Sequence, residues 1–247
     1  MHDLTERQKN ILEIVIREYI EGAAPISSSF IEEEYRLGVS PATIRSELYN
    51  LAEEGYLYQP HTSSGRVPTD MGYRFFVNLL TEKEIKRLEK KIIMEVRKMQ
   101  REVDSRFQFM QDFTRFLAHT SSSLTLSYFP RESILLKEGW AEVFRDPEFD
   151  DADKVRDFMG MVGDFEENID SFLDVGKNSC IRVYIGGEAP FSRRKDFSVV
   201  ISPCKILKRK GILAIMGPKR MAYDRNIQLV DSIIKLLQDN GGRKKEN

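Results

Sequence analysis

The stretch from Gly38 to Phe76 constrains the fold most, because it places a strong helix-start signal before a short amphipathic segment and two strand-like segments. Ser40 is a favoured N-cap residue, and Pro41 occupies the first helical position, where a missing N–H costs nothing. The apolar stripe that follows consists of Ile44, Leu48 and Leu51. Since Gly55 closes this pattern, the spacing predicts one short helix that buries a single face.

Two further helices are predicted before this one. Thr5 followed by Gln8 is a capping box, and the apolar residues near it recur at helical spacing until Gly22. These residues are Leu4, Ile11, Leu12, Val15, Ile16 and Tyr19. Ser29 with Glu32 repeats the capping signal for a short second helix, and a tight turn at residues 37–39 follows. Helix, short helix, turn and capped helix is the order of a helix-turn-helix.

A small hairpin is predicted directly after the third helix. Residues 56–59 and Val67 are strand-like and flank the polar loop PHTSSGR, which has Gly65 at its tip. A helix-turn-helix followed by a hairpin is a winged helix. We therefore expect residues 1–80 to form a winged-helix DNA-binding domain.

The helix face opposite the apolar stripe is left for solvent or for the major groove of DNA. On the DNA-binding interpretation, Arg45 can bond guanine O6 and N7, and Asn50 can pair with adenine. The predicted DNA-binding residues, with the wing included, are Ser40, Pro41, Ala42, Thr43, Arg45, Ser46, Tyr49, Asn50, His61, Ser63, Ser64, Gly65 and Arg66. A solvated helix face is the alternative. Glu47 has two interpretations, which are reading cytosine N4 and holding a neighbouring arginine.

The charge balance does not by itself favour a nucleic-acid partner. The chain has 38 basic and 39 acidic residues, for a net charge of -1, and residues 1–80 hold seven basic and twelve acidic residues. DNA binding must therefore depend on where the charges lie and not on their sum. The acidic sum favours another candidate function, a scaffold that uses the winged helix for protein contacts.

The same residues resemble a known family. "GVSPATIRSEL" followed by "LAEEGYLYQPHTSSGRVPTDMGYRFFV" is similar to the signature of the heat-inducible transcription repressor (HrcA) family. "PEFDDADKVRDF" and "GILAIMGPKRMAYDRNIQLVDSIIKLL" resemble the C-terminal part of that family. The resemblance implies a homodimeric repressor that binds an inverted-repeat operator in double-stranded DNA upstream of chaperone genes, is kept active by a GroE-type chaperonin and is released on heat shock.

Carried over to matching positions, the resemblance assigns residues to the two DNA-contacting elements. Those on the recognition helix are Ser40, Pro41, Ala42, Thr43 and Arg45, and those on the wing are Gly65 and Arg66. Ser46 and Glu47 stand where the family pattern is expected to have Asn and Asp. The operator sequence is therefore not implied by the resemblance.

The family resembled has a GAF-like domain interrupted by an inserted dimerisation domain. In this chain "SSSLTLSYFPRE" is followed almost directly by "SILLKEGWAEVFRDPEF". We therefore expect the insert and some GAF-like strands to be missing. The usual mode of dimerisation cannot be assumed for this chain.

Residues 81–119 are predicted to form a long linker and dimerisation helix instead. Apolar residues recur there at spacings of three and four without Pro or Gly, which predicts one helix of about 36 residues, about 54 Å long. The predicted dimerisation residues are Ile85, Leu88, Ile92, Val96, Met99, Val103 and Phe107, and the stripe continues through Met110, Phe113 and Leu117. The alternative is that this stripe packs on its own C-terminal domain.

Residues 120–240 are predicted to form a reduced GAF-like regulatory domain, which makes the fold class α+β. The expected strands are residues 124–129, 181–185, 197–202 and 211–216, and the expected helices are residues 151–162, residues 164–175 and a final helix striped by Ile227, Val230, Ile234 and Leu237. The tail 241–247 is expected to be disordered. The basic segments "FSRRKDF" and "KILKRKG" are interpreted as solvated turns.

No catalytic site is predicted, because the chain has no Gly-rich phosphate loop, paired carboxylates or nucleophile-base set. We therefore do not expect an enzyme. GAF domains often hold small ligands, so a second candidate is a winged-helix regulator of another circuit whose GAF-like domain senses a small ligand.

The two cysteines and three histidines match no zinc spacing, and neither a metal nor a cofactor is expected. Cys180 and Cys204 lie in apolar strand-like segments and are predicted to be buried, inert thiols. The longest apolar runs are far shorter than the roughly 20 residues of a membrane span, and the N-terminus is polar. A cytoplasmic protein without a membrane partner is expected.

Overall fold

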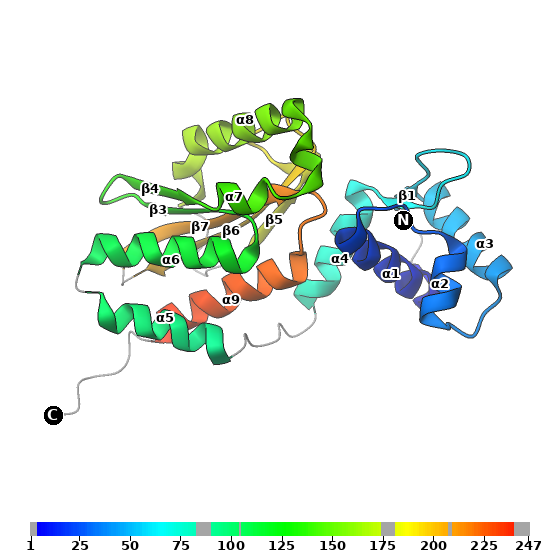
Figure 1. The fold of residues 1–247 in the computed structure, drawn as a ribbon, viewed down its shortest axis with the longest axis horizontal. Helices are drawn as coiled ribbons and strands as arrows, with labels where there is room; N and C mark the ends of the chain where they lie inside the picture. The colour runs from blue at the N-terminus through cyan, green and yellow to red at the C-terminus, as the bar shows by residue number, and fades with distance from the viewer. Residues whose placement is uncertain (1–3, 83–89, 104, 174–180, 207–208, 240–247) are drawn as a thin grey trace. The chain divides into compact units, whose positions relative to one another are not determined.

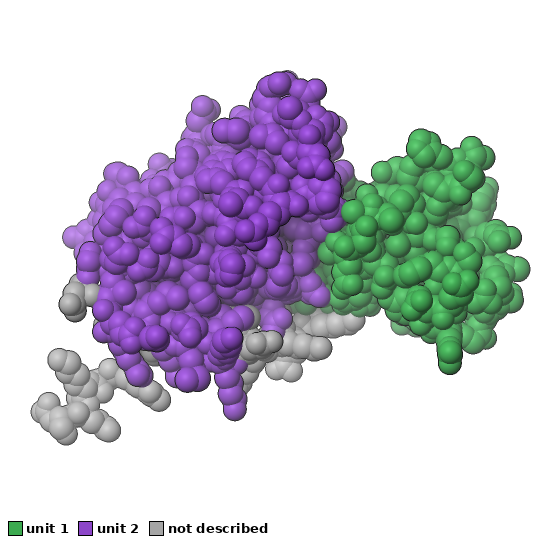
Figure 2. Space-filling model, viewed as in Figure 1, with its two compact units in different colours: residues 1–83 green, residues 84–247 purple. Residues whose placement is uncertain are grey.

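The computed structural model describes residues 4–82, 90–103, 105–173, 181–206 and 209–239. The chain divides into two compact units, residues 1–83 and residues 84–247 (Figure 2). Both units contain helices and antiparallel strands, so the predicted α+β class is confirmed. Among the described residues, no helix is both long enough and apolar enough to cross a bilayer.

The first unit has three helices, a two-stranded hairpin and a fourth helix (Figure 1). Its elements are α1 (Glu6–Gly22), α2 (Ser28–Tyr35), α3 (Pro41–Glu53), β1 (Leu57–Tyr58), β2 (Val67–Pro68) and α4 (Asp70–Glu82). The side chains at its centre are all at most 4% exposed: Ile11, Leu12, Val15, Ile16, Ile31, Ile44, Leu48, Leu51 and Phe76. The hydrophobic stripes of α1 and α3 therefore meet in one small core, to which α4 contributes Phe76.

Two of the three predicted helix starts are confirmed. The Thr5 amide donates to Gln8 Oε1 at 2.9 Å, and the Gln8 amide donates to Thr5 Oγ1 at 3.3 Å, which is the predicted capping box. The Thr43 amide donates to Ser40 Oγ at 3.2 Å, and Pro41 follows the cap as expected.

The predicted cap of the second helix is wrong by two residues. Ser27 caps α2, since its Oγ accepts from the Phe30 amide at 3.1 Å, and Ser29 lies inside the helix. The reason is a bridge between Ile26 and Arg66, which holds the chain extended up to Ser27. Three serines in a row offer the same cap chemistry, and this tertiary contact selects the first of them.

The second unit is built on a five-stranded antiparallel sheet with the order β4-β3-β7-β6-β5. The strands are β3 (Leu124–Phe129), β4 (Ile134–Glu138), β5 (Arg182–Ile185), β6 (Phe197–Ile206) and β7 (Arg209–Pro218). The helices are α5 (Lys90–Glu102), α6 (Arg106–Ser121), α7 (Trp140–Val143), α8 (Ala152–Asn168) and α9 (Tyr223–Asp239). Single 3₁₀ turns span η1 (Pro147–Asp150), η2 (Ile169–Phe172) and η3 (Gly186–Glu188).

The helices cover both faces of this sheet. Helices α6 and α9 pack on one face and α8 on the other, while α5 packs against α6 (Figure 1). Alternation along β3 shows the two faces, because Leu124 and Leu126 belong to the apolar cluster beneath α8. Ser127, on the opposite face, accepts a 2.9 Å hydrogen bond from Thr114 of α6 or donates to it.

The four predicted strands are present, and β6 and β7 extend beyond their predicted ends to form an antiparallel pair of ten residues in each strand. Strand β4 was not predicted, because its residues alternate neither in polarity nor in burial. Residues 152–162 and 164–168 are helical as predicted, but the break predicted between the two helices is wrong, since α8 passes unbroken through Gly163 to Asn168. A side chain at Gly163 would meet nothing within 4 Å, and the burial of Phe158 and Phe165 on either side outweighs the low helix propensity of one glycine.

The prediction of a single long linker helix is also wrong. Helix α5 ends at Glu102, and α6 begins at Arg106 with Ser105 as its N-cap, whose Oγ accepts from the Gln108 amide at 3.4 Å. The stripe is divided between two helices that pack together, which lets α6 bury Phe113 and Leu117 against the sheet of its own chain. Ile85, Leu88, Cys180 and the predicted tail 241–247 lie outside the described residues.

A buried ion-pair cluster joins two segments that are far apart in the sequence. Arg220, which follows β7 and is 8% exposed, donates from Nε to Glu148 Oε1 at 2.8 Å and also pairs with Asp146. Burial raises the pKa of Glu148, and the Arg220 charge opposes that rise. The two segments that carry the C-terminal resemblance thus meet at this arginine.

Replacing Arg220 with Leu should lower the free energy of unfolding by about 3–5 kcal/mol, because it leaves two partly buried carboxylates without a cation. Urea denaturation would measure this. Without Arg220 the burial that raises the pKa of Glu148 is no longer opposed, so the deficit should shrink as the pH falls and Glu148 becomes protonated. Arg156→Leu, which breaks an ion pair with both side chains about three-quarters exposed, is the control and should cost at most about 1 kcal/mol. Equal losses for both variants would contradict the prediction.

Candidate nucleic-acid interface

Helix α3 presents the face that the sequence predicted. Ile44, Leu48 and Leu51 are at most 4% exposed, so the opposite face is left to solvent. The predicted residues on that face are exposed, apart from a half-buried Thr43: Pro41, Ala42, Arg45, Ser46, Tyr49 and Asn50. Tyr49 is the largest apolar group among them at 55% exposure.

Glu47 does not point into this face. Its side chain is only 15% exposed, and its carboxylate accepts from Arg7 Nη1 of α1 at 3.5 Å. Of the two interpretations of Glu47, the structure therefore supports the one in which it holds a neighbouring arginine. Arg7 could not be predicted as the partner from local spacing, because the two residues are 40 positions apart.

The loop between β1 and β2 is held by its own polar groups. Gln59 Nε2 donates to the carbonyls of Thr62 at 3.0 Å and Ser64 at 2.8 Å. Ser64 Oγ accepts from the His61 amide at 3.0 Å and lies 2.7 Å from the His61 carbonyl. Ser64, predicted to contact DNA, is thus engaged inside the loop, whereas His61 and Ser63 are exposed. Tyr58, which was not assigned to the site, is 48% exposed on β1.

A close backbone approach anchors the end of this loop. The Ile26 amide donates to the Arg66 carbonyl at 2.9 Å, and the Arg66 amide donates back at 2.8 Å. A Cβ added at Gly65 would lie 2.4 Å from the Ile26 carbonyl carbon and oxygen. Only glycine therefore fits at Gly65 without a shift of the backbone.

The cations of the first unit differ in how far acids neutralise them. Lys9 pairs with Glu6 at 2.8 Å, and Arg17 pairs with Glu13 at 2.9 Å. Arg36, Arg45 and Arg66 have no ion pair within the described part of the chain. The Nε of Arg66 is moreover buried without a hydrogen-bond partner in that part of the chain.

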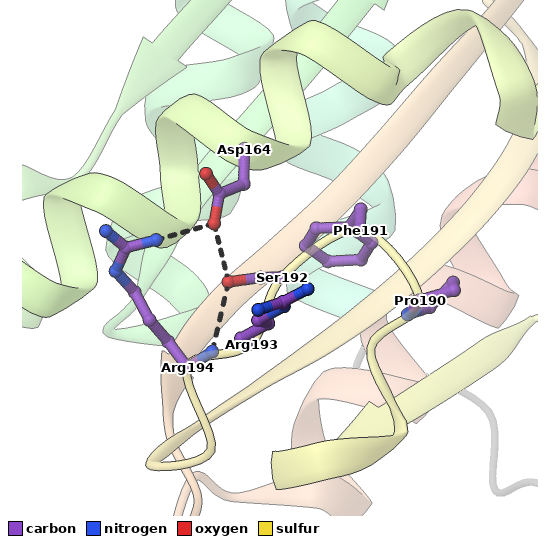
Figure 3. Close-up of a pocket in the computed structure, with 6 residues that line it drawn as sticks. All are labelled: Asp164, Pro190, Phe191, Ser192, Arg193 and Arg194. Carbon is purple, nitrogen blue, oxygen red and sulfur yellow. Dashed lines mark hydrogen bonds and ion pairs between the residues drawn. The ribbon is translucent and has the colours of Figure 1, made fainter.

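The second unit contains a shallow pocket of about 390 Å³, lined by Asp164 and residues 190–194 (Figure 3). Asp164 Oδ2 accepts from Ser192 Oγ at 2.7 Å and from Arg194 Nη1 at 2.6 Å, whereas Arg194 Nε is buried without a hydrogen-bond partner in the described part of the chain. No histidine lies in the lining to activate Ser192. The described residues also hold no cluster of His, Cys, Asp or Glu able to bind a metal ion.

The space between α8 and the sheet is filled by aromatic side chains. Five phenylalanines there are at most 7% exposed: Phe149, Phe158, Phe165, Phe172 and Phe197. Phe158 stacks edge-on against Phe149 and Phe197, with ring centroids 5.1 Å away in both cases. Cys204 is buried as predicted, and burial raises the pKa of its thiol to about 12, so the thiolate is scarce at neutral pH.

The predicted dimerisation residues within the described ranges differ in exposure. Val96 is fully buried within its own chain, so it is not part of an open seam. Ile92, Met99 and Val103 are half-buried. Phe107 is 48% exposed at the start of α6.

The chain matches the family model of the HrcA protein C-terminal domain over residues 72–227, which is more than half of its length. It is 25% identical to the heat-inducible transcription repressor HrcA of Chlorobium phaeobacteroides (strain BS1), covering 93% of this chain and 96% of that protein. It is 28% identical to the repressor of the same name from Prosthecochloris aestuarii, covering 93% and 95%.

The alignment with the Chlorobium phaeobacteroides protein is 342 positions long, whereas this chain has 247 residues. The relative therefore has residues without a counterpart here, in agreement with the expected loss of an insert. A crystal structure of a hypothetical protein has the same fold, with a TM-score of 0.78 at 20% identity over 96% of this chain and 98% of that chain. The fold is thus shared with another chain.

Replacing Gly65 with Ala should break the bridge to Ile26, because the added Cβ has no room, and should destabilise the first unit by about 1–3 kcal/mol. Hydrogen exchange at the Ile26 and Arg66 amides would show the loss as faster exchange. Gly22→Ala is the control, since a Cβ there meets nothing within 4 Å. Unchanged protection at both amides in Gly65→Ala would show that the backbone approach is not needed.

Proposed function

The chain belongs to the HrcA family, and on that premise we propose that it is a DNA-binding repressor of heat-shock (chaperone) genes that binds an inverted-repeat operator as a dimer. Relatives along nearly the whole chain are named heat-inducible transcription repressors, which supports release of the operator on heat stress. Residues 1–80 form the winged-helix DNA-binding domain in this proposal, residues 81–119 the linker and dimerisation segment, and residues 120–240 a reduced GAF-like regulatory domain. A GroE-type chaperonin is proposed as the partner that keeps the repressor active.

The observation that carries the proposal is the pairing of α3 with the loop after β1. One face of α3 is buried and the other is exposed, and α3 contacts β1, which leads into the loop. A helix whose exposed face stands beside a hairpin loop matches the docking geometry of a recognition helix with a wing. The loop is ordered by Gln59 and Ser64 and so presents Arg66 on a fixed backbone.

The chemistry of the exposed face suits direct reading of bases. Arg45 has the planar fork that matches guanine O6 and N7, and Asn50 has the donor and acceptor that match adenine. The first turn of α3, capped by Ser40, presents backbone amides to which a phosphate can bind. Arg66, with its unsatisfied Nε, suits a phosphate or the minor groove beside the same turn of DNA.

An inverted repeat requires two recognition helices about 34 Å apart, so two copies of the chain must associate. We propose that α5 and the start of α6 contribute to this dimer, with Ile92, Met99, Val103 and Phe107 as the apolar residues. Phe107 supports this most directly, because 48% of its surface is exposed in one chain. Val96 has no place in that surface, because its own chain covers it completely.

Arg45→Ala should weaken binding to the operator by about 1–3 kcal/mol and relax sequence preference at one base pair per half-site. Arg66→Ala should weaken binding to all sequences about evenly and reduce the dependence of affinity on salt, because it removes a phosphate contact. Fluorescence anisotropy with operator and scrambled duplexes at several salt concentrations would measure both effects. A wild-type protein that binds no duplex at low salt would favour the scaffold function instead.

Phe107→Glu should convert the dimer to a monomer, because it places a charge where an apolar contact would be desolvated. Operator affinity should fall toward the non-specific level, since each half-site would then be bound alone. Light scattering would report the mass. Met159→Glu, at a residue that is 56% exposed on α8, is the matched control and should leave the mass unchanged. A Phe107→Glu variant that stays dimeric would place the interface elsewhere.

A further inference from the structure

Arg7 of α1 contacts Glu47 of α3, the helix with the predicted DNA-binding face. Arg7 lies in the first turn of α1, and its side chain is 53% exposed although Nη1 is 3.5 Å from the Glu47 carboxylate. The 3.5 Å contact with the mostly covered Glu47 carboxylate orients the Arg7 guanidinium. The remaining N–H donors of the guanidinium stay exposed to solvent and can bind a second anion.

The backbone that carries Arg7 is fixed on both sides. The capping box of Thr5 and Gln8 satisfies the first amides of α1, and Leu4 is 7% exposed just before the cap. Arg7 is therefore presented by an ordered helix start, with little of the entropy cost that ordering a mobile terminus would add.

Helical spacing locates Arg7 relative to the recognition face. Along α3, Glu47 follows Thr43 by four residues and precedes Asn50 by three, so these three side chains lie along one side of the helix. Arg7, in contact with Glu47, must lie beyond that flank, whereas Arg45 lies on the other flank of the exposed face. The exposed face of α3 thus has a guanidinium on each side.

The charge of the first unit makes an additional cation important. Twelve acids stand against seven basic residues in residues 1–80, and Lys9 and Arg17 are paired with acids of their own helix. A DNA-binding surface in such a unit must gather its few available cations around the recognition helix. Arg7 is the one that a carboxylate of α3 itself draws toward that helix.

We propose that Arg7, positioned by Glu47, binds a backbone phosphate of the operator on the Thr43–Asn50 side of α3. This rests on the proposed DNA-binding function. Arg7 carries no sequence information in this role, and Glu47 reads no base. The DNA-binding surface therefore extends from the third helix to the start of the first.

The test compares Arg7→Ala, Arg7→Lys and Lys9→Ala in the full chain, with operator and scrambled duplexes over a range of salt concentrations. Arg7→Ala should weaken binding to both duplexes by about the same factor, roughly five- to tenfold near 0.1 M salt, and should reduce the salt slope by about one. Arg7→Lys should retain the slope, because it retains the charge. Lys9→Ala is the control, because it also removes one positive charge from α1. Lys9 is two residues after Arg7 and therefore on the opposite side of the helix, so this variant should change neither the affinity nor the salt slope.

Glu47→Gln tests the positioning role. It should leave the ratio of operator to scrambled affinity unchanged, whereas loss of preference at one base pair would show that Glu47 reads a base and would overturn the assignment. If Arg7→Ala binds DNA with the affinity and salt slope of the wild type while Arg45→Ala binds the operator more weakly, the role of Arg7 is overturned. The proposed function would then stand. Absence of DNA binding by the wild-type chain would overturn both. Thermal unfolding of each variant separates these results from loss of the fold, which is not expected because the contact is long at 3.5 Å and its arginine is 53% exposed.

Discussion

Burial of one stripe on α3 is the constraint on which the candidate interface depends. Ile44, Leu48 and Leu51 complete the small core of the first unit, so the helix cannot turn without exposing them to water. That fixes which side chains remain outside, and it fixes Glu47 at the edge of the core, within reach of α1. The hairpin then follows within a few residues of the end of α3, so its loop cannot move far from the exposed face. Orientation of the recognition surface is thus a result of packing, and the polar residues on it are free to serve specificity.

Local signals predicted the local structure, and long-range contacts account for what they missed. The capping box at Thr5 and the Ser40–Pro41 start were predictable because both ends of each interaction lie within four residues. The true cap of α2 was not, because the bridge from Ile26 to Arg66 spans 40 positions. The same holds for the partner of Glu47 and for Arg220, whose acids lie more than 70 positions away. The exposed residues of α3 followed from periodicity alone, whereas the internal role of Ser64 required the conformation of its loop.

The division of the predicted linker helix shows how periodicity can predict a stripe correctly and its partner wrongly. Spacings of three and four describe an apolar stripe whether another chain or the same chain covers it. Here α6 lays its part of the stripe on the sheet, and α5 folds back on α6 and buries Val96. Two large apolar side chains stay exposed in this pair of helices: Met94 on α5 at 69% and Phe107, just after the Ser105 cap of α6, at 48%. A dimer of this chain therefore has much less apolar surface available near α5 and α6 than an uninterrupted helix would have offered.

The packing beneath α8 bears on whether the second unit is a ligand sensor. A ligand pocket in a domain of this kind needs space between a helix layer and the sheet, and here the rings of Phe149, Phe158 and Phe197 are in mutual contact in that layer. Opening a cavity for a metabolite would cost the burial of those rings, several kilocalories per mole for each displaced side chain. The pocket at Asp164 is shallow, and the Asp164 carboxylate in it is already bonded to Ser192 and Arg194. Control of the proposed repressor by another protein, or by temperature acting on the fold, is therefore easier to reconcile with this core than control by a small molecule bound within it.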